Sequence, residues 1–138
     1  MFKKLLMIAF VVAMPVAHAC DYRYSAVLQV QAVIVAHGGA PKLQPEKCRA
    51  LEAAGMQLQI DGSASVLAHI PVGWVLVSVI DGNRVISTTY RMSTSVDPKQ
   101  PGSINRAREL VYEGLVTAVR DLDVSRAIGE VREARGTK

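Results

Sequence analysis

The stretch that decides the fold runs from residue 74 to residue 96 and reads WVLVSVIDGNRVISTTYRMSTSV. Two runs rich in β-branched residues flank Asp81-Gly82-Asn83. Asp-Gly is a strong hairpin signal, because glycine accepts the positive φ that such a turn requires. The stretch therefore predicts an antiparallel hairpin with arms at 74–80 and 84–96.

The two arms of the hairpin differ in polarity. Alternate residues of the first arm are apolar on both faces, which is typical of a central strand covered on both sides. One face holds Trp74, Leu76 and Ile80, and the other holds Val75, Val77 and Val79. In the second arm one face holds Ile86, Tyr90 and Met92, and the other holds Ser87, Thr89 and Arg91. We therefore expect the second arm to have one wet side and to lie near the sheet edge, with Trp74 in the core.

Upstream, the segment from Tyr22 to Ala36 is rich in Val, Ile and Tyr. Because β-branched residues favour extended backbone, we expect a long strand here. The same segment also fits helical spacing through Val27, Val30 and Ile34, with Gly38 as a C-terminal cap. A helix is therefore the alternative.

Two shorter elements follow before the hairpin. Pro45 is tolerated in a first helical turn and predicts a helix from there to about Gly55. Residues 56–60 alternate strictly and precede Asp61-Gly62-Ser63, which predicts a short strand and a turn. Continuation of the helix through residues 56–60 is the alternative.

Two helices are predicted after the hairpin. Ser103 can cap the first by accepting a hydrogen bond from a free backbone N–H, and Asp123 can cap the second. The first helix has an apolar stripe of Ile104, Ala107, Val111, Leu115, Ala118 and Leu122. The second turns Val124, Ala127, Ile128 and Val131 inward before a charged, frayed tail at 132–138.

These elements predict an α+β fold, in which a small, mostly antiparallel sheet has two or three helices packed on one face. The strand order stays open. With 50% hydrophobic residues, residues 20–138 can bury one core and form a single domain. The formal charge is +4, of which Lys3 and Lys4 supply two, so the rest of the chain carries too little positive charge to indicate nucleic-acid binding.

The first 19 residues have the pattern of a secretory signal peptide. Lys3 and Lys4 precede an apolar run at 5–14, and small residues at Ala17 and Ala19 suit a signal peptidase. A membrane anchor is the alternative, but a spanning helix needs about 20 apolar residues and Pro15 interrupts this run. We therefore expect an exported protein that begins at Cys20.

Two cysteines offer Cys20 two mutually exclusive fates. Cys20 lies where bacterial lipoprotein precursors carry the cysteine that is acylated, and Asp21 resembles the aspartate that retains such proteins in the inner membrane; His18 departs from that signal. In an oxidising compartment, a Cys20–Cys48 disulfide is the rival interpretation. The protein is thus expected in the periplasm, or attached to the membrane if Cys20 is lipidated.

The sequence predicts no catalytic residue, no metal site and no cofactor. His37, His69 and Cys48 are too far apart in sequence to form a metal-binding motif. Residues 37–40, His-Gly-Gly-Ala, look like an esterase oxyanion loop, but the chain has no G-x-S-x-G elbow for the nucleophile. Phosphate-binding glycine loops are also missing.

One aromatic and basic cluster remains as a candidate interaction surface. Tyr22, Arg23 and Tyr24 follow the cleavage site directly and could contact a partner or dock the N-terminus. Packing of the two tyrosines against the domain is the alternative.

We therefore expect a non-enzymatic exported envelope protein, an accessory or assembly subunit of a secretion, transport or appendage complex. Its partner would be another envelope protein, and it would contact the membrane only through a lipid on Cys20. A periplasmic inhibitor or immunity protein is one alternative, and a small hydrolase without a recognisable motif is another. The sequence does not determine the oligomeric state.

Overall fold

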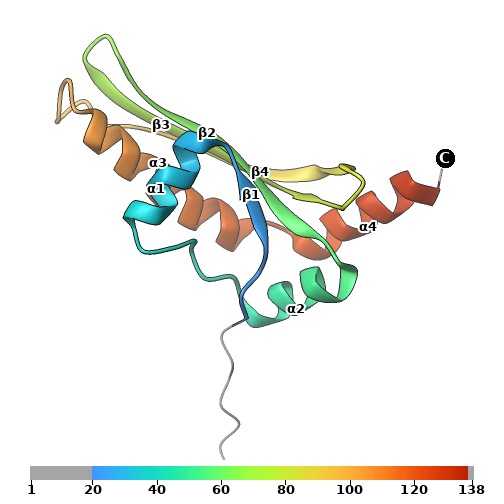
Figure 1. Cartoon of the computed structure of the whole chain (residues 1–138). Coiled ribbons are helices and arrows are strands. Elements are labelled where there is room, and N and C mark those ends of the chain that lie inside the picture. Colours follow the sequence, from blue (N-terminus) through green and yellow to red (C-terminus); the bar gives the residue numbers. More distant parts are fainter. Residues whose placement is uncertain (1–19, 137–138) are drawn as a thin grey trace, which may run out of the picture.

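The computed structural model describes residues 20–136, so the predicted signal peptide lies outside the described residues. Along the chain a short strand is followed by a helix pair, a run of three strands and a second helix pair (Figure 1). They are β1 (Tyr24–Ala26), α1 (Leu28–Ala36), α2 (Pro45–Ala54), β2 (Gln57–Leu67), β3 (Ile70–Ile80), β4 (Ile86–Val96), α3 (Ile104–Asp121) and α4 (Val124–Gly136).

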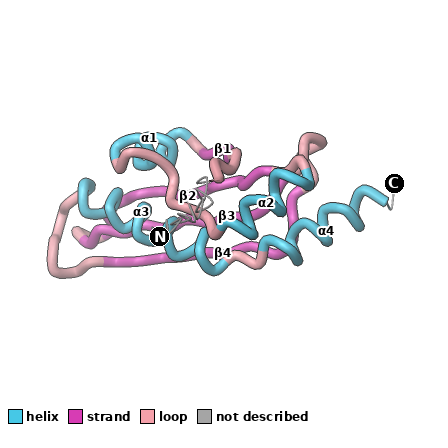
Figure 2. Tube along the Cα trace, turned by 90° about the horizontal axis from the view of Figure 1, so that it is seen from below, coloured by secondary structure: helices cyan, strands magenta, loops and turns pink. Residues whose placement is uncertain are grey.

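The strands form one sheet in the order β1-β2-β3-β4. Strands β2, β3 and β4 are an antiparallel meander, and the short β1 adds to β2 in parallel. Seen from below, α2, α3 and α4 lie in front of the sheet, and α1 lies beside β1 (Figure 2). The predicted α+β fold is therefore confirmed, with four helices rather than two or three within residues 20–136.

The core lies between the sheet and its helices. Every second residue of β2 and β3 faces this core. Examples that are fully buried are Leu58, Ile60, Val75 and Val77. Helix α3 approaches β3 closely because residue 73 is glycine: a Cβ there would lie 2.7 Å from the backbone nitrogen of Val111. Gly73 thus sets the distance between α3 and the sheet.

The predicted long strand at Tyr22–Ala36 is wrong. Only Tyr24–Ala26 is extended, and Leu28–Ala36 is helical. Val30, Val33 and Ile34 are buried at helical spacing, so packing outweighs the β preference of these residues. Gly38 follows the helix with a φ of 82°, as the helical alternative expects.

The predicted turn at Asp61-Gly62-Ser63 is also wrong, because β2 continues through it to Leu67. Gly62 faces the core, where a Cβ would lie 2.6 Å from the carbonyl oxygen of Trp74 and 3.0 Å from Val30. This glycine permits close packing rather than a turn. The chain reverses instead at Ala68 and His69, which have φ values of 47° and 66°.

The β3–β4 hairpin is confirmed, but the residue with positive φ in its turn is not Gly82. Arg84 adopts it, with a φ of 62°. One oxygen of the Asp81 carboxylate stabilises the turn by accepting hydrogen bonds from the backbone N–H groups of Asn83 at 2.9 Å and Val85 at 2.8 Å. Its second oxygen is 2.7 Å from Nε of Arg135 in α4, an ion-pair distance without hydrogen-bond geometry.

The predicted helix ends are largely confirmed. Helix α2 begins at Pro45 and ends before Gly55, whose φ is 65°. The Ser103 hydroxyl caps α3 by accepting a hydrogen bond from the backbone N–H of Arg106 at 3.0 Å. The stripe of α3 is buried except for Ile104, which is 42% exposed. Helix α4 extends to Gly136, beyond the predicted start of the tail.

Candidate interaction surfaces

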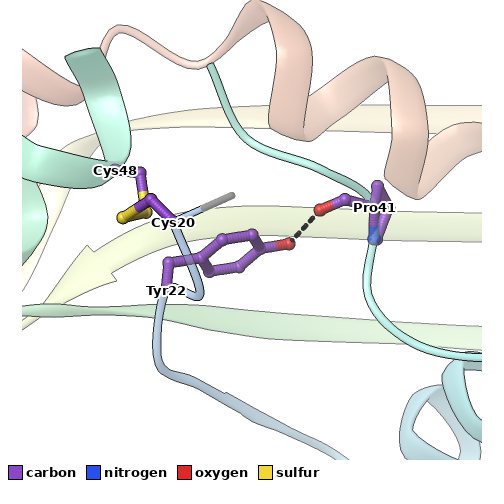
Figure 3. Close-up of a disulfide and its surroundings, with 4 residues drawn as sticks. All are labelled: Cys20, Tyr22, Pro41 and Cys48. Atoms are coloured by element: carbon purple, nitrogen blue, oxygen red, sulfur yellow. Dashed lines mark hydrogen bonds between the residues drawn. A yellow bond between two sulfur atoms is a disulfide. The ribbon is translucent and has the colours of Figure 1, made fainter. Parts of the chain in front are cut away.

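A disulfide joins Cys20 to Cys48 (Figure 3). Their Cα atoms are 6.0 Å apart and 28 positions separate them in sequence. The bond ties the start of the described chain to α2, and Cys48 is fully buried. The disulfide occupies the thiol of Cys20, which lipidation would need. A disulfide fits an exported protein, and no helix within residues 20–136 has the length and apolar character needed to cross a bilayer.

The structure places Tyr22 and Tyr24 together against the core and leaves Arg23 exposed. The two rings are 6.2 Å apart and tilted by 55°. The Tyr22 hydroxyl donates to the carbonyl oxygen of Pro41 at 2.7 Å (Figure 3). Burial raises the pKa of this hydroxyl above its ordinary value. In this arrangement the tyrosines fasten the N-terminal segment to the domain.

The two histidines within residues 20–136 lie in separate turns. His37 ends α1, where its ring stacks on Tyr112 at 4.0 Å between centroids. The Tyr112 hydroxyl donates to the carbonyl oxygen of Gly39 at 3.2 Å, so this pair anchors the turn after α1. His69 lies in the β2–β3 turn. Across residues 20–136, no three His, Cys, Asp or Glu side chains are placed to hold a metal ion.

A groove of about 570 Å³ runs along α1 and reaches the first turns of α3. We call it the α1 groove. It is lined by Leu28, Gln29, Ala32, Val33, Ala36, His37, Ala64, Ile104 and Arg108. Its volume is within the range of about 300–1,000 Å³ typical of binding pockets.

Helix α1, with the sequence LQVQAVIVA, has apolar side chains on its outer as well as its inner side, and Gln29 and Gln31 are its only polar residues. Its inner side chains are buried, but Leu28 is 88% exposed and Val35 is 68% exposed. Helices that are apolar all round are normally buried on all sides. The outer side of α1 is therefore an apolar surface without a cover in the described chain.

Arg108 supplies the positive charge of the α1 groove. Its hydrogen bond is a long one, 3.4 Å, to the amide oxygen of Asn105. The neighbouring Arg106 differs, because it contacts the carboxylates of Asp97 at 2.8 Å and Glu113 at 2.7 Å. The hydrogen bond from Arg106 holds the pKa of Asp97 below its usual range. In the described part of the chain Arg108 forms no such ion pair, so its charge is available to a partner.

The second uncovered surface is the sheet face opposite the helices, which we call the open sheet face. Because side chains alternate along a strand, it holds the residues between the buried ones. They are Gln57, Gln59, Asp61, Ser63, Ser65 and Leu67 of β2, Ile70, Val72, Trp74 and Leu76 of β3, and Tyr90, Met92, Thr94 and Val96 of β4. Ser78 and Ile80 of β3 lie on the same side but are buried, so they do not belong to the open sheet face.

Strand β4 lies at the edge of the sheet, as predicted, but its solvent-exposed side is the opposite of the one expected. Tyr90, Met92 and Val96 are 51%, 56% and 59% exposed on the open sheet face. Polar residues face the helices instead: Ser93 lies against Gly114 of α3, and Nε of Arg91 donates to the carbonyl oxygen of Asp121 at 2.9 Å. The apolar side of β4 is therefore the one in water.

The prediction that β3 is covered on both faces holds at Ile80, which is buried, but is wrong for Trp74 and Leu76. The face with Val75, Val77 and Val79 is buried under the helices. Trp74 and Leu76 lie on the open sheet face and are only partly buried. Trp74 is therefore at the surface rather than in the core.

No family model matches this chain, and no match was found among curated proteins or among solved structures. A function for this chain must therefore be argued from the geometry of the α1 groove and the open sheet face.

Proposed function

We propose that this chain is a non-enzymatic exported protein that serves as an accessory or assembly subunit of an envelope complex and binds a partner protein in the α1 groove. One observation carries the proposal: the outer side of α1 is apolar, yet it is exposed, with Leu28 88% and Val35 68% accessible. Exposed contiguous apolar surface of this kind marks interaction sites.

The lining of the α1 groove indicates what the partner presents. Leu28, Ala32 and Ile104 offer aliphatic surface along the groove, and Arg108 offers a guanidinium at one side. A guanidinium pairs with a carboxylate through two parallel hydrogen bonds. The groove thus suits an apolar helix or extended segment with an Asp or Glu next to its apolar residues.

The proposed location is the periplasm. The disulfide between Cys20 and Cys48 supports an oxidising compartment and occupies the thiol that a lipid would use. The predicted signal at residues 1–19 supports the same route.

The test is co-purification of the tagged protein from gently solubilised envelopes of the native cell. Leu28→Asp places a charge in the α1 groove and is expected to remove the partner, because an aspartate cannot fill the apolar contact. Thr117→Asp, at an exposed position further along α3, is the matched control and is expected to retain it. Equal recovery of the same partner by both variants would contradict the proposal, as would no envelope partner with the wild type.

A further inference from the structure

We propose that a second copy of this chain covers the open sheet face, so that two sheets pack face to face in a two-fold symmetric dimer. This surface lies on the side of the sheet away from the helices. The inference therefore rests on different residues from the α1 groove, and either can fail without the other.

The polarity of β4 is the first argument. Tyr90, Met92 and Val96 point to solvent, while Ser93 takes the place next to α3 that an apolar residue would normally fill. Such an arrangement costs free energy in an isolated chain, because apolar area stays in water. It is favourable when another apolar surface covers this side of the strand.

The distribution of charge indicates which surface that is. Asp61 is the sole side chain on the open sheet face, as defined above, that carries a charge at neutral pH. A two-fold interface must be complementary to itself, and a nearly uncharged surface meets this condition because like charges do not face each other. A face with a single charged residue offers little to select a charged partner.

The apolar and polar parts of the face are also separated as an interface requires. Apolar residues concentrate on β3 and β4, and Gln57, Gln59, Asp61, Ser63 and Ser65 line β2. With the two-fold axis over β3 and β4, the apolar side chains meet at the centre and the β2 row forms a polar rim. An apolar centre with a polar rim is the usual anatomy of protein interfaces.

The area is sufficient for a dimer of moderate stability. Three strands of 11 residues, at about 3.3 Å per residue and about 4.8 Å between strands, give a face of about 500 Å² per copy. Two copies would bury about 1,000 Å², the lower end for a specific interface. We therefore expect a dimer that dissociates on dilution.

Pairing of two copies through the edge of β4 does not explain the same observations. Edge pairing adds strands within the sheet plane, so Tyr90, Met92 and Val96 would stay in water. One end of that edge is also occupied, because Glu130 of α4 accepts the backbone N–H of Thr89 at 2.6 Å. Face-to-face packing, by contrast, buries these side chains.

Trp74 makes the proposal directly measurable. It is the single tryptophan of the chain and lies on the open sheet face. Its fluorescence should be blue-shifted in the dimer and move to the red on dilution, as the indole becomes exposed to water. The experiment records sedimentation and Trp74 emission together, on protein exported to and purified from the periplasm of a bacterial host, across a wide range of concentration.

The wild type is expected to reach twice the mass of one chain at high concentration. Met92→Glu is expected to stay at one chain mass with red-shifted emission, whereas Val116→Glu, on the helical side, should still dimerise. An unchanged far-UV spectrum would show that Met92→Glu folds. A wild type that stays monomeric would overturn the proposal, as would dimeric Met92→Glu or a dimer without the Trp74 shift.

Discussion

At the scale of single residues, the carboxylate of Glu130 connects α4 to the sheet edge. It accepts hydrogen bonds from the Thr89 hydroxyl at 2.6 Å, the Thr89 backbone N–H at 2.6 Å and the Thr88 hydroxyl at 2.8 Å. These bonds favour the charged form and lower the pKa of Glu130 from 4.5 to about 2.

Stability should therefore depend on pH through Glu130. Because the folded pKa is below the ordinary value, the stabilisation is complete above about pH 4.5 and is lost as the pH falls toward 2. Urea unfolding as a function of pH should show this loss in the wild type and a flatter dependence in Glu130→Gln. Thr89→Val, which removes one donor, should also flatten it. Identical pH profiles for wild type and Glu130→Gln would contradict this role.

Arg84 holds backbone strain in the β3–β4 turn, since its φ is 62°. Left-handed backbone costs a non-glycine residue about 1–2 kcal/mol. Glycine would remove this strain but loses more chain entropy on folding, which cancels part of the gain. Arg84→Gly should therefore stabilise the fold by up to about 1 kcal/mol in urea titrations. Gly82→Ala, at a position with open space and no positive φ, is the control and should change little. Destabilisation by Arg84→Gly would show that the arginine side chain contributes more than its backbone costs.

At the scale of elements, the contact between α3 and β3 depends on one missing side chain. A Cβ at Gly73 would meet the backbone of α3 at 2.7 Å and 2.8 Å, and backbone cannot move aside as a side chain can. Gly73→Ala should therefore destabilise the fold by about 1–3 kcal/mol, the usual range for an overpacked core.

The same substitution in α4 provides the matched control. Gly129 is helical, and a Cβ there would meet nothing within 4 Å. Gly129→Ala should stabilise the fold by up to about 1 kcal/mol, because alanine is the better helix former. Chemical denaturation of both variants would check the pair, and a harmless Gly73→Ala would contradict the close approach of α3.

Elements with local signals were predictable from the sequence. Asp81 and its neighbours indicated the hairpin, Pro45 and Gly55 marked α2, and Ser103 capped α3. Each signal is a short-range interaction between a side chain and nearby backbone.

Helix α1 was not predictable in this way, because its β-branched residues favour a strand locally while its burial against β2 decides for the helix. The helical spacing of Val30 and Ile34 was the signal that pointed to it. Since the α1 groove is lined mainly by residues of this helix, the groove was not predictable either. Alternation along β4 gave two faces correctly, but alternation alone does not tell which face the helices cover.

At the scale of the whole molecule, the disulfide closes the N-terminal segment onto α2. Cross-linking residues separated by 28 positions restricts the unfolded chain and should contribute about 3 kcal/mol. The double variant Cys20→Ser, Cys48→Ala should lose about this much in urea unfolding, and reductant should lower the wild type to the same level. A wild type insensitive to reductant, or a purified protein with a lipid on Cys20, would contradict the disulfide.

The two proposed binding surfaces lie on opposite sides of the molecule. The helical side holds the α1 groove with Arg108, and the opposite side holds the open sheet face with Trp74. A dimer through the sheets would present two α1 grooves outward, one on each copy. That geometry suits a subunit that joins other envelope proteins.

The most direct test of the central claim is photo-crosslinking in living cells from position 32, inside the α1 groove, compared with exposed position 117 on α3. A photoreactive residue replacing Ala32 is predicted to form a discrete adduct with one envelope protein, and Arg108→Glu in the same chain should abolish it. The residue replacing Thr117 should form none. Equal adducts from both positions, or none from position 32, would contradict the claim that the α1 groove binds a partner.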